Sequence, residues 1–111
     1  MTKFEKLTAD LKAAYNAAYP AAIKTDEGGT MNFDAPGVWL PRWPESKTLE
    51  AVKAAGWHAI KWDGRYLGRP GFWLLVPPSC GCGNRKSIFA EMLTEHLTAA
   101  GYAAYCYCES D

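Results

Sequence analysis

The sequence lacks an excess of charge of either sign and any long apolar run. Its 12 basic and 12 acidic side chains cancel, so it lacks the general attraction to phosphate backbones that a basic protein has. No apolar stretch approaches the roughly 18 residues that a membrane helix needs. The N-terminal segment carries charges throughout, unlike the apolar centre of a signal peptide. We therefore expect a cytoplasmic protein without a membrane partner, and nucleic acid is disfavoured but stays open.

Sequence motifs of known catalytic sites are also absent. The chain has no P-loop, no G-x-S-x-G, no HExxH and no dinucleotide-binding fingerprint. Its two histidines, His58 and His96, fall on a predicted strand and on the apolar side of a predicted helix. At such positions a hydrogen-bonded structural histidine is more common than a catalytic base. The sequence therefore predicts a protein that is not an enzyme.

What the chain does have is a composition for one compact domain. It contains 111 residues, of which 49% are hydrophobic and five are tryptophan, as is typical of a globular protein with a core. We predict a single domain over residues 1–111. Within it, residues 1–24 hold an N-terminal helix and residues 35–108 hold a core of strands and helices.

The segment 3–19 has the spacing of an amphipathic helix. Its apolar side chains recur at steps of three and four residues, at Phe4, Leu7, Leu11, Ala14, Tyr15 and Ala18. Thr2 can cap the start of this helix, and Glu5 three residues later completes a capping box. Pro20 predicts an end or a kink.

The rest of the chain alternates between strand and helix patterns. In chain order we predict a strand at 38–40, a helix capped by Ser46 and closed by Gly56, strands at 57–62 and 72–77, a helix at 85–100 ended by Gly101, and a strand at 102–108. The stretches "AAGWHA" (54–59) and "AAGYAA" (99–104) indicate matching helix-glycine-strand junctions.

This order predicts an α+β fold. An N-terminal helix is followed by a ferredoxin-like βαββαβ unit with a four-stranded antiparallel sheet and two helices on one face. The N-terminal helix is available to cover the other face. That face would otherwise expose Trp39, Trp73, Tyr105 or Tyr107.

The four cysteines form two closely spaced pairs, Cys80 with Cys82 and Cys106 with Cys108. In the predicted topology the third and fourth strands run in the same direction, so both pairs fall at one end of the sheet. Four thiolates in tetrahedral array form a common structural zinc site, although the usual spacing is C-x₂₋₄-C and here it is C-x-C. We predict a structural Zn²⁺ site at these four cysteines. Disulfides, plain buried thiols and thiol redox chemistry stay open as alternatives.

A second candidate site is the stretch "GVWLPRWP" at 37–44. Tryptophan and arginine dominate the energetics of protein interfaces, so Trp39, Arg42 and Trp43 are candidate partner-binding residues. Alternatively, this stretch is a simple connection whose two tryptophans pack on the core. Arg65 and Arg69, on the predicted hairpin, complete the candidate set.

The same aromatic residues also allow a nucleic-acid-binding role. An RRM-type domain has this order of elements and stacks bases on aromatic side chains of its sheet. Trp39 and Trp73 lie on the candidate central strands. No RNP-like motif is present, and the net charge is zero, so we favour a core role for these rings.

With Cys80, Cys82, Cys106 and Cys108 as a four-thiol site, this small chain resembles, in general character, the small zinc-containing anti-CRISPR proteins of phages. That resemblance implies an inhibitor that binds a CRISPR effector nuclease and obstructs its use of DNA. It also implies residence in the cytosol of a host cell. No contact residue follows from the resemblance. The leading expectation is therefore a zinc-stabilised protein-interaction module.

Overall fold

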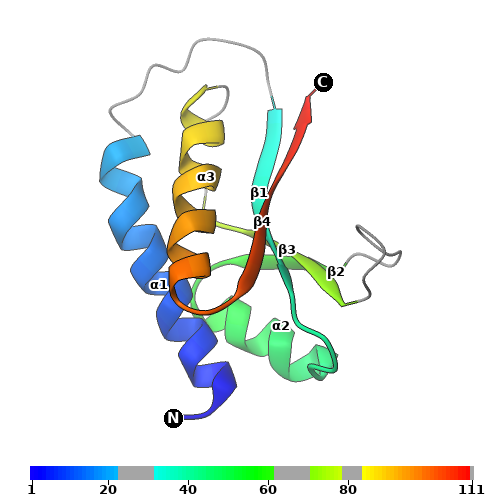
Figure 1. The fold of residues 1–111 in the computed structure, drawn as a ribbon. Helices are drawn as coiled ribbons and strands as arrows, with labels where there is room; N and C mark the ends of the chain where they lie inside the picture. The colour runs from blue at the N-terminus through cyan, green and yellow to red at the C-terminus, as the bar shows by residue number, and fades with distance from the viewer. Residues whose placement is uncertain (23–31, 62–70, 79–83, 111) are drawn as a thin grey trace.

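The computed structural model describes residues 1–22, 32–61, 71–78 and 84–110 (Figure 1). These residues form α1 (Lys3–Ala22), β1 (Asn32–Trp39), α2 (Glu45–Ala54), β2 (His58–Lys61), β3 (Phe72–Val76), α3 (Asn84–Ala99) and β4 (Ala103–Ser110). The predicted α+β class, with an N-terminal helix ahead of a four-stranded antiparallel sheet, is confirmed. None of the helices described is long and apolar enough to cross a membrane.

The strands lie in the order β2-β3-β1-β4, and each neighbouring pair is antiparallel. Because β3 and β4 both run against β1, they are parallel to each other, as the sequence predicted. Val38 of β1 lies opposite Trp73 on one side and Ala104 on the other. Residues opposite each other in a sheet share a face, so this row points to one side.

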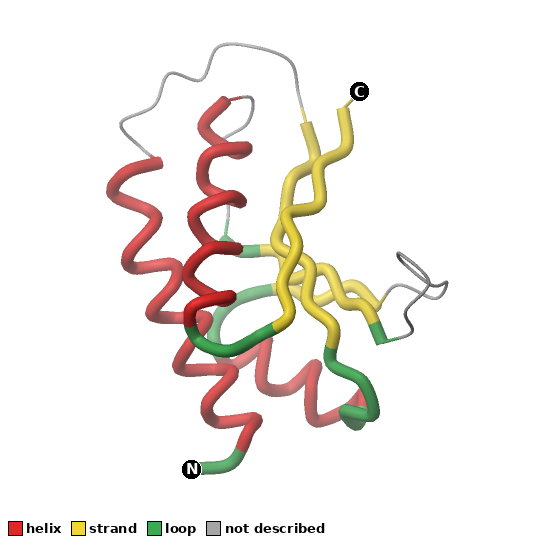
Figure 2. Tube along the Cα trace, in the orientation of Figure 1, coloured by secondary structure: helices red, strands yellow, loops and turns green. Residues whose placement is uncertain are grey.

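All three helices lie on the side of the sheet that Val38 and Trp73 face (Figure 2). The main core lies between the helices and the sheet, and its buried residues include Leu7, Leu11, Val38, Val52, Trp57, Trp73, Leu75, Phe89, Leu93 and Leu97. The idea that α1 covers the opposite face of the sheet is therefore wrong. Its apolar stripe packs against α2 and α3 instead, because those helices present the buried side chains that complement it.

The opposite face of the sheet carries a second, smaller cluster. Trp39, Phe72 and Leu74 are buried there, and Tyr107 packs against them. Trp39 and Phe72 are in ring contact, with centroids 4.8 Å apart. Gly37 is needed for this packing, because a Cβ at that position would lie 2.1 Å from the Phe72 ring. Trp39 and Trp73 thus sit on the central strands but on opposite faces.

The ends of the helices test the capping predictions. At the start of α1, Glu5 N–H donates to Thr2 Oγ1 and Thr2 N donates to Glu5 Oε1, at 3.1 and 2.9 Å, so the capping box is confirmed. The predicted Ser46 cap is wrong. The cap position is Pro44, which makes no side-chain bond, and its carbonyl instead accepts the Thr48 amide and hydroxyl at 3.0 and 2.7 Å. Helix α1 does not end at Pro20, where the sequence predicts an end or a kink, but continues to Ala22.

The two predicted helix-glycine-strand junctions are built alike. Gly56 and Gly101 have φ values of +84° and +106°, a conformation that glycine adopts without steric cost. Beyond each glycine, the Trp57 amide donates to Val52 O and the Tyr102 amide to Leu97 O, both at 3.1 Å. These bonds are the mark of a Schellman motif. The two copies of the repeat therefore end α2 and α3 in the same way.

A polar network joins α1 to the junction between α3 and β4. Lys6 Nζ donates to Asp10 Oδ2 at 2.7 Å and to the Ala100 carbonyl at 3.0 Å. The Tyr102 hydroxyl donates to the same Asp10 oxygen at 2.7 Å, and Lys6 lies 4.7 Å from the Tyr102 ring centre. Burial, together with the hydrogen bond to Asp10, raises the pKa of Tyr102 far above its usual 10.0. Burial opposes ionisation of Asp10, but the bonds from Lys6 and Tyr102 hold its carboxyl pKa below 3.8.

Replacing Tyr102 with Phe should make the free energy of unfolding less sensitive to alkali. Because the pKa of Tyr102 is raised in the folded state, its stabilising contribution is complete below the unfolded value of 10.0 and is lost as the pH rises above it. The stability difference between wild type and Tyr102→Phe should therefore stay constant in neutral solution and shrink above pH 10. Urea titrations of both proteins at a series of pH values measure this difference. A difference that is unchanged at alkaline pH would contradict the network.

Candidate partner-binding site

The connection from β1 to α2 is a short turn held rigidly by backbone hydrogen bonds. The Leu40 amide donates to the Gly71 carbonyl at 2.9 Å, and the Trp43 amide donates to the Leu40 carbonyl at 3.2 Å. Prolines 41 and 44 restrict the backbone on either side. One hydrogen bond therefore closes the turn, and the other ties it to Gly71, the residue that precedes β3.

Arg42 occupies an unusual backbone conformation in this turn. Its φ is +66°, and no other non-glycine residue in the described part of the chain has a positive φ. For a residue with a Cβ this left-handed conformation costs roughly 1–2 kcal/mol. The Arg42 side chain is exposed. Strained backbone of this kind is concentrated at functional sites, so Arg42 is the residue of the turn with the strongest claim to a function.

Trp43 anchors the turn to the start of α1. Its ring makes an edge-to-face contact with Phe4, with centroids 5.3 Å apart and planes at 74°. Lys3 Nζ lies 4.8 Å from the Trp43 ring centre, which is within the range of a cation–π interaction. Trp43 is half-buried. Its indole thus has one part packed on the protein and another part that a partner can reach.

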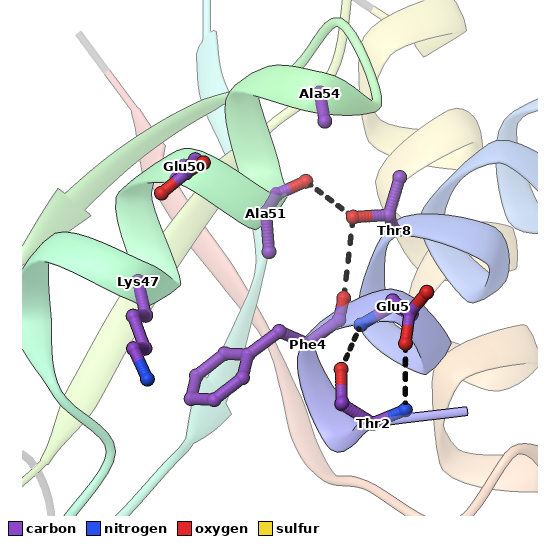
Figure 3. A pocket seen from close by; sticks show the side chains of 8 residues that line it. All are labelled: Thr2, Phe4, Glu5, Thr8, Lys47, Glu50, Ala51 and Ala54. Atoms are coloured by element: carbon purple, nitrogen blue, oxygen red, sulfur yellow. Dashed lines mark hydrogen bonds between the residues drawn. The ribbon is translucent and has the colours of Figure 1, made fainter.

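A groove between α1 and α2 begins beside this anchor (Figure 3). Its volume is about 370 Å³, and its lining residues are Thr2, Phe4, Glu5, Thr8, Lys47, Glu50, Ala51 and Ala54. Figure 3 shows Phe4 pointing from α1 toward α2, and the Thr8 hydroxyl bridging the Phe4 and Ala51 carbonyls at 3.2 and 2.8 Å. Phe4 therefore links the groove to Trp43. Together the exposed Arg42, the half-buried Trp43 and this groove form one candidate surface, which we name the Arg42 turn surface.

The remaining predicted partner-binding residues do not gather here. Trp39 is only 8% exposed and belongs to the cluster on the opposite sheet face. Arg65 and Arg69 lie outside the described residues. The sequence stretch that suggested one site thus divides in two, because Trp39 is a strand residue and Trp43 belongs to the turn.

The cysteines are only partly described. Cys106 is half-buried, and Cys108 follows it on β4, at the register position opposite Asp34. Cys80 and Cys82 lie outside the described residues, between the end of β3 at Val76 and the start of α3 at Asn84. Among the residues described, no group of three or more metal-binding side chains gathers. The zinc site stays a prediction.

The positions of the strands are nevertheless compatible with that site. Gly37 lies opposite Leu74 of β3 and opposite Tyr105 of β4, so Leu74 and Tyr105 are level across β1. Two residues beyond Leu74 the strand β3 ends, and Cys106 and Cys108 follow Tyr105 in the same direction. The C-terminal end of β3, which precedes Cys80 and Cys82 in the sequence, therefore lies at the end of the sheet where β4 carries its cysteines.

Sequence reasoning missed the contributions of Lys3 and Phe4 to the site. They lie about forty positions from Trp43 in the chain, and Phe4 looked like an ordinary member of the α1 apolar stripe. No local pattern signals such a contact. No protein-family model, curated protein or solved structure matches the chain, so no relative supplies a function to carry over.

Two substitutions at Arg42 separate backbone strain from side-chain function. Arg42→Gly removes both the side chain and the strain, whereas Arg42→Ala removes the side chain and keeps the Cβ that causes the strain. We expect the glycine variant to be more stable than the alanine variant by about 1 kcal/mol. Chemical denaturation measures this difference. Equal stability of the two variants would show that Arg42 is not strained.

Proposed function

We propose that the protein is a small, zinc-stabilised protein-interaction module that acts as an inhibitor by occlusion. The single observation that carries this proposal is the exposed Arg42 held at φ +66° beside the half-buried Trp43. Arginine and tryptophan are the residues most enriched in interface hot spots, especially where packing fixes them before binding. A turn that keeps a strained backbone and presents an arginine is better suited to binding than to stability.

The proposed partner is a nuclease that handles nucleic acid, such as a CRISPR effector. The support for this narrower statement is the resemblance to small zinc-containing anti-CRISPR proteins. Binding at a site where the nuclease must accept DNA would block DNA use without any catalytic step by the inhibitor. The turn supplies a cation, Arg42, and the Nζ atoms of Lys3 and Lys47 lie 5.4 and 5.8 Å from the centre of the Phe4 ring, which contacts Trp43 of the turn. Acidic pockets of a nuclease would complement these charges.

The finer fold proposal is a ferredoxin-like βαββαβ unit preceded by α1. Two observations support it. After α1 the elements follow the order strand, helix, strand, strand, helix, strand, and β1 and β3 are the inner strands of the sheet.

A nucleic-acid-binding role on the sheet is the second candidate, and the aromatic residues on the face opposite the helices favour it. Trp39, Phe72, Tyr105 and Tyr107 all lie on that face. Base stacking needs an exposed ring, whereas Trp39 is 8% exposed and Phe72 is fully buried. Tyr105, at 44% exposed, is the best-presented ring. The burial of the two central rings places this role behind protein binding.

The binding proposal predicts that reversing the charge of Arg42 weakens inhibition. Wild-type protein should suppress DNA binding and cleavage by a purified CRISPR effector nuclease. Arg42→Glu should weaken this inhibition by at least about tenfold, equivalent to roughly 1.4 kcal/mol of binding energy. Lys12→Glu is the matched control, because Lys12 is exposed on α1 and undergoes the same charge change. Equal loss in both variants would contradict a specific site at the turn, and a salt-sensitive shift of generic DNA by the protein alone would favour the second candidate.

The zinc proposal predicts about one zinc ion per chain in protein purified under reducing conditions without chelator. Replacing Cys80, Cys82, Cys106 and Cys108 with serine should abolish metal binding and lower the melting temperature. Chelator should destabilise the wild-type protein, whereas reductant should not. The opposite response, sensitivity to reductant alone, would indicate disulfides. A metal-free protein that is as stable as its four-serine variant would exclude the zinc site.

A further inference from the structure

The groove between α1 and α2 carries separate positive and negative charges (Figure 3). Lys47 and Glu50 both line it and lie about one turn apart on α2. Opposite charges at this spacing on a helix can pair with each other. In the described part of the chain, however, neither side chain takes part in an ion pair. Both charges are therefore available to a ligand in the groove.

The positive charge is concentrated at the Phe4 end of the groove. The Nζ atoms of Lys3 and Lys47 lie 5.4 and 5.8 Å from the Phe4 ring centre, and Lys3 has no carboxylate partner among the described residues either. Four residues further along both helices, Thr8 bonds the Ala51 carbonyl, so both helices have their N-terminal ends at the Phe4 end. The partial positive charge of helix N-termini adds to the two ammonium groups. This end of the groove therefore favours a carboxylate.

We infer that the groove binds a short extended peptide segment of a partner protein. One acidic side chain of the segment lies at the Phe4 end, and a basic side chain two residues away faces Glu50. Side chains two apart on an extended chain point the same way and lie roughly 7 Å apart. Lys47 and Glu50 are about 4.5 Å apart along the helix axis, and their long side chains span the difference. The inference rests on the proposed function, because it names the chemistry of the partner segment that the Arg42 turn surface takes.

The dimensions and charges of the groove favour a peptide over a nucleic acid. Between the lining residues Thr2 and Thr8, α1 rises by roughly 9 Å, which an extended chain covers with about three residues. A nucleic acid carries a negative charge on every phosphate, so Glu5 and Glu50 in the groove wall would repel it. A peptide with one acidic and one basic side chain avoids this repulsion and satisfies both charges of the groove.

Titration with the blocked peptide Ala-Glu-Ala-Lys-Ala, followed by NMR, tests this inference. Amide signals of Phe4, Lys47 and Glu50 should shift over a series reaching the millimolar range, and replacing the glutamate of the peptide with glutamine should weaken binding about threefold or more. Lys47→Glu should weaken binding about tenfold, because repulsion replaces attraction. Lys53→Glu is the control, because Lys53 is exposed on the same helix and does not line the groove; it should bind like the wild type. Absence of shifts in the wild-type protein, or equal loss of binding in both variants, would overturn the inference.

The comparison of the two peptides uses only wild-type protein, so it does not depend on a variant folding. It also contains no nuclease, which separates this inference from the proposed function. Inhibition of a nuclease without peptide binding in the groove would overturn the inference and leave the proposed function intact. Peptide binding by a protein that inhibits no nuclease would support the inference and count against the proposed function. Displacement of the peptide by a single-stranded DNA oligonucleotide that binds more tightly would assign the groove to nucleic acid and overturn the inference.

Discussion

The pairing of Val38 with both Trp73 and Ala104 is the constraint on which the rest of the structure depends. It places Trp73 under the helices and Trp39 on the opposite face. A slip of one residue would exchange these faces for every side chain of β1. The large, fully buried Trp73 and the tight contact of Phe72 with Gly37 both exclude that slip. The register also sets where β1 ends and hence where the Arg42 turn emerges.

Helix α1 packs against α2 and α3 and contacts two parts of the chain that are distant in sequence. Lys6 binds the carbonyl at the end of α3, and Phe4 packs against Trp43 at the start of α2. The N-terminal helix therefore contributes more than its apolar stripe. It orients the candidate binding surface, because the ring that anchors the turn is its own Phe4. The Phe4–Trp43 contact and the bond from the Trp43 amide to the Leu40 carbonyl hold the residues on either side of Arg42.

Local signals predicted much of the fold. Periodicity located α1 and α3 to within a few residues, and the two glycine junctions predicted where α2 and α3 end. The strand β1 was predicted only at 38–40, because Pro36 and Pro41 are expected to bound it. It extends from Asn32 because β4 pairs with that whole segment, and this pairing depends on residues about seventy positions away. The layer that α1 occupies was unpredictable for the same reason, since both faces of the sheet carry aromatic residues. At the candidate site, Arg42 and Trp43 stood out by composition, but the positive φ and the Phe4 contact had no sequence signal.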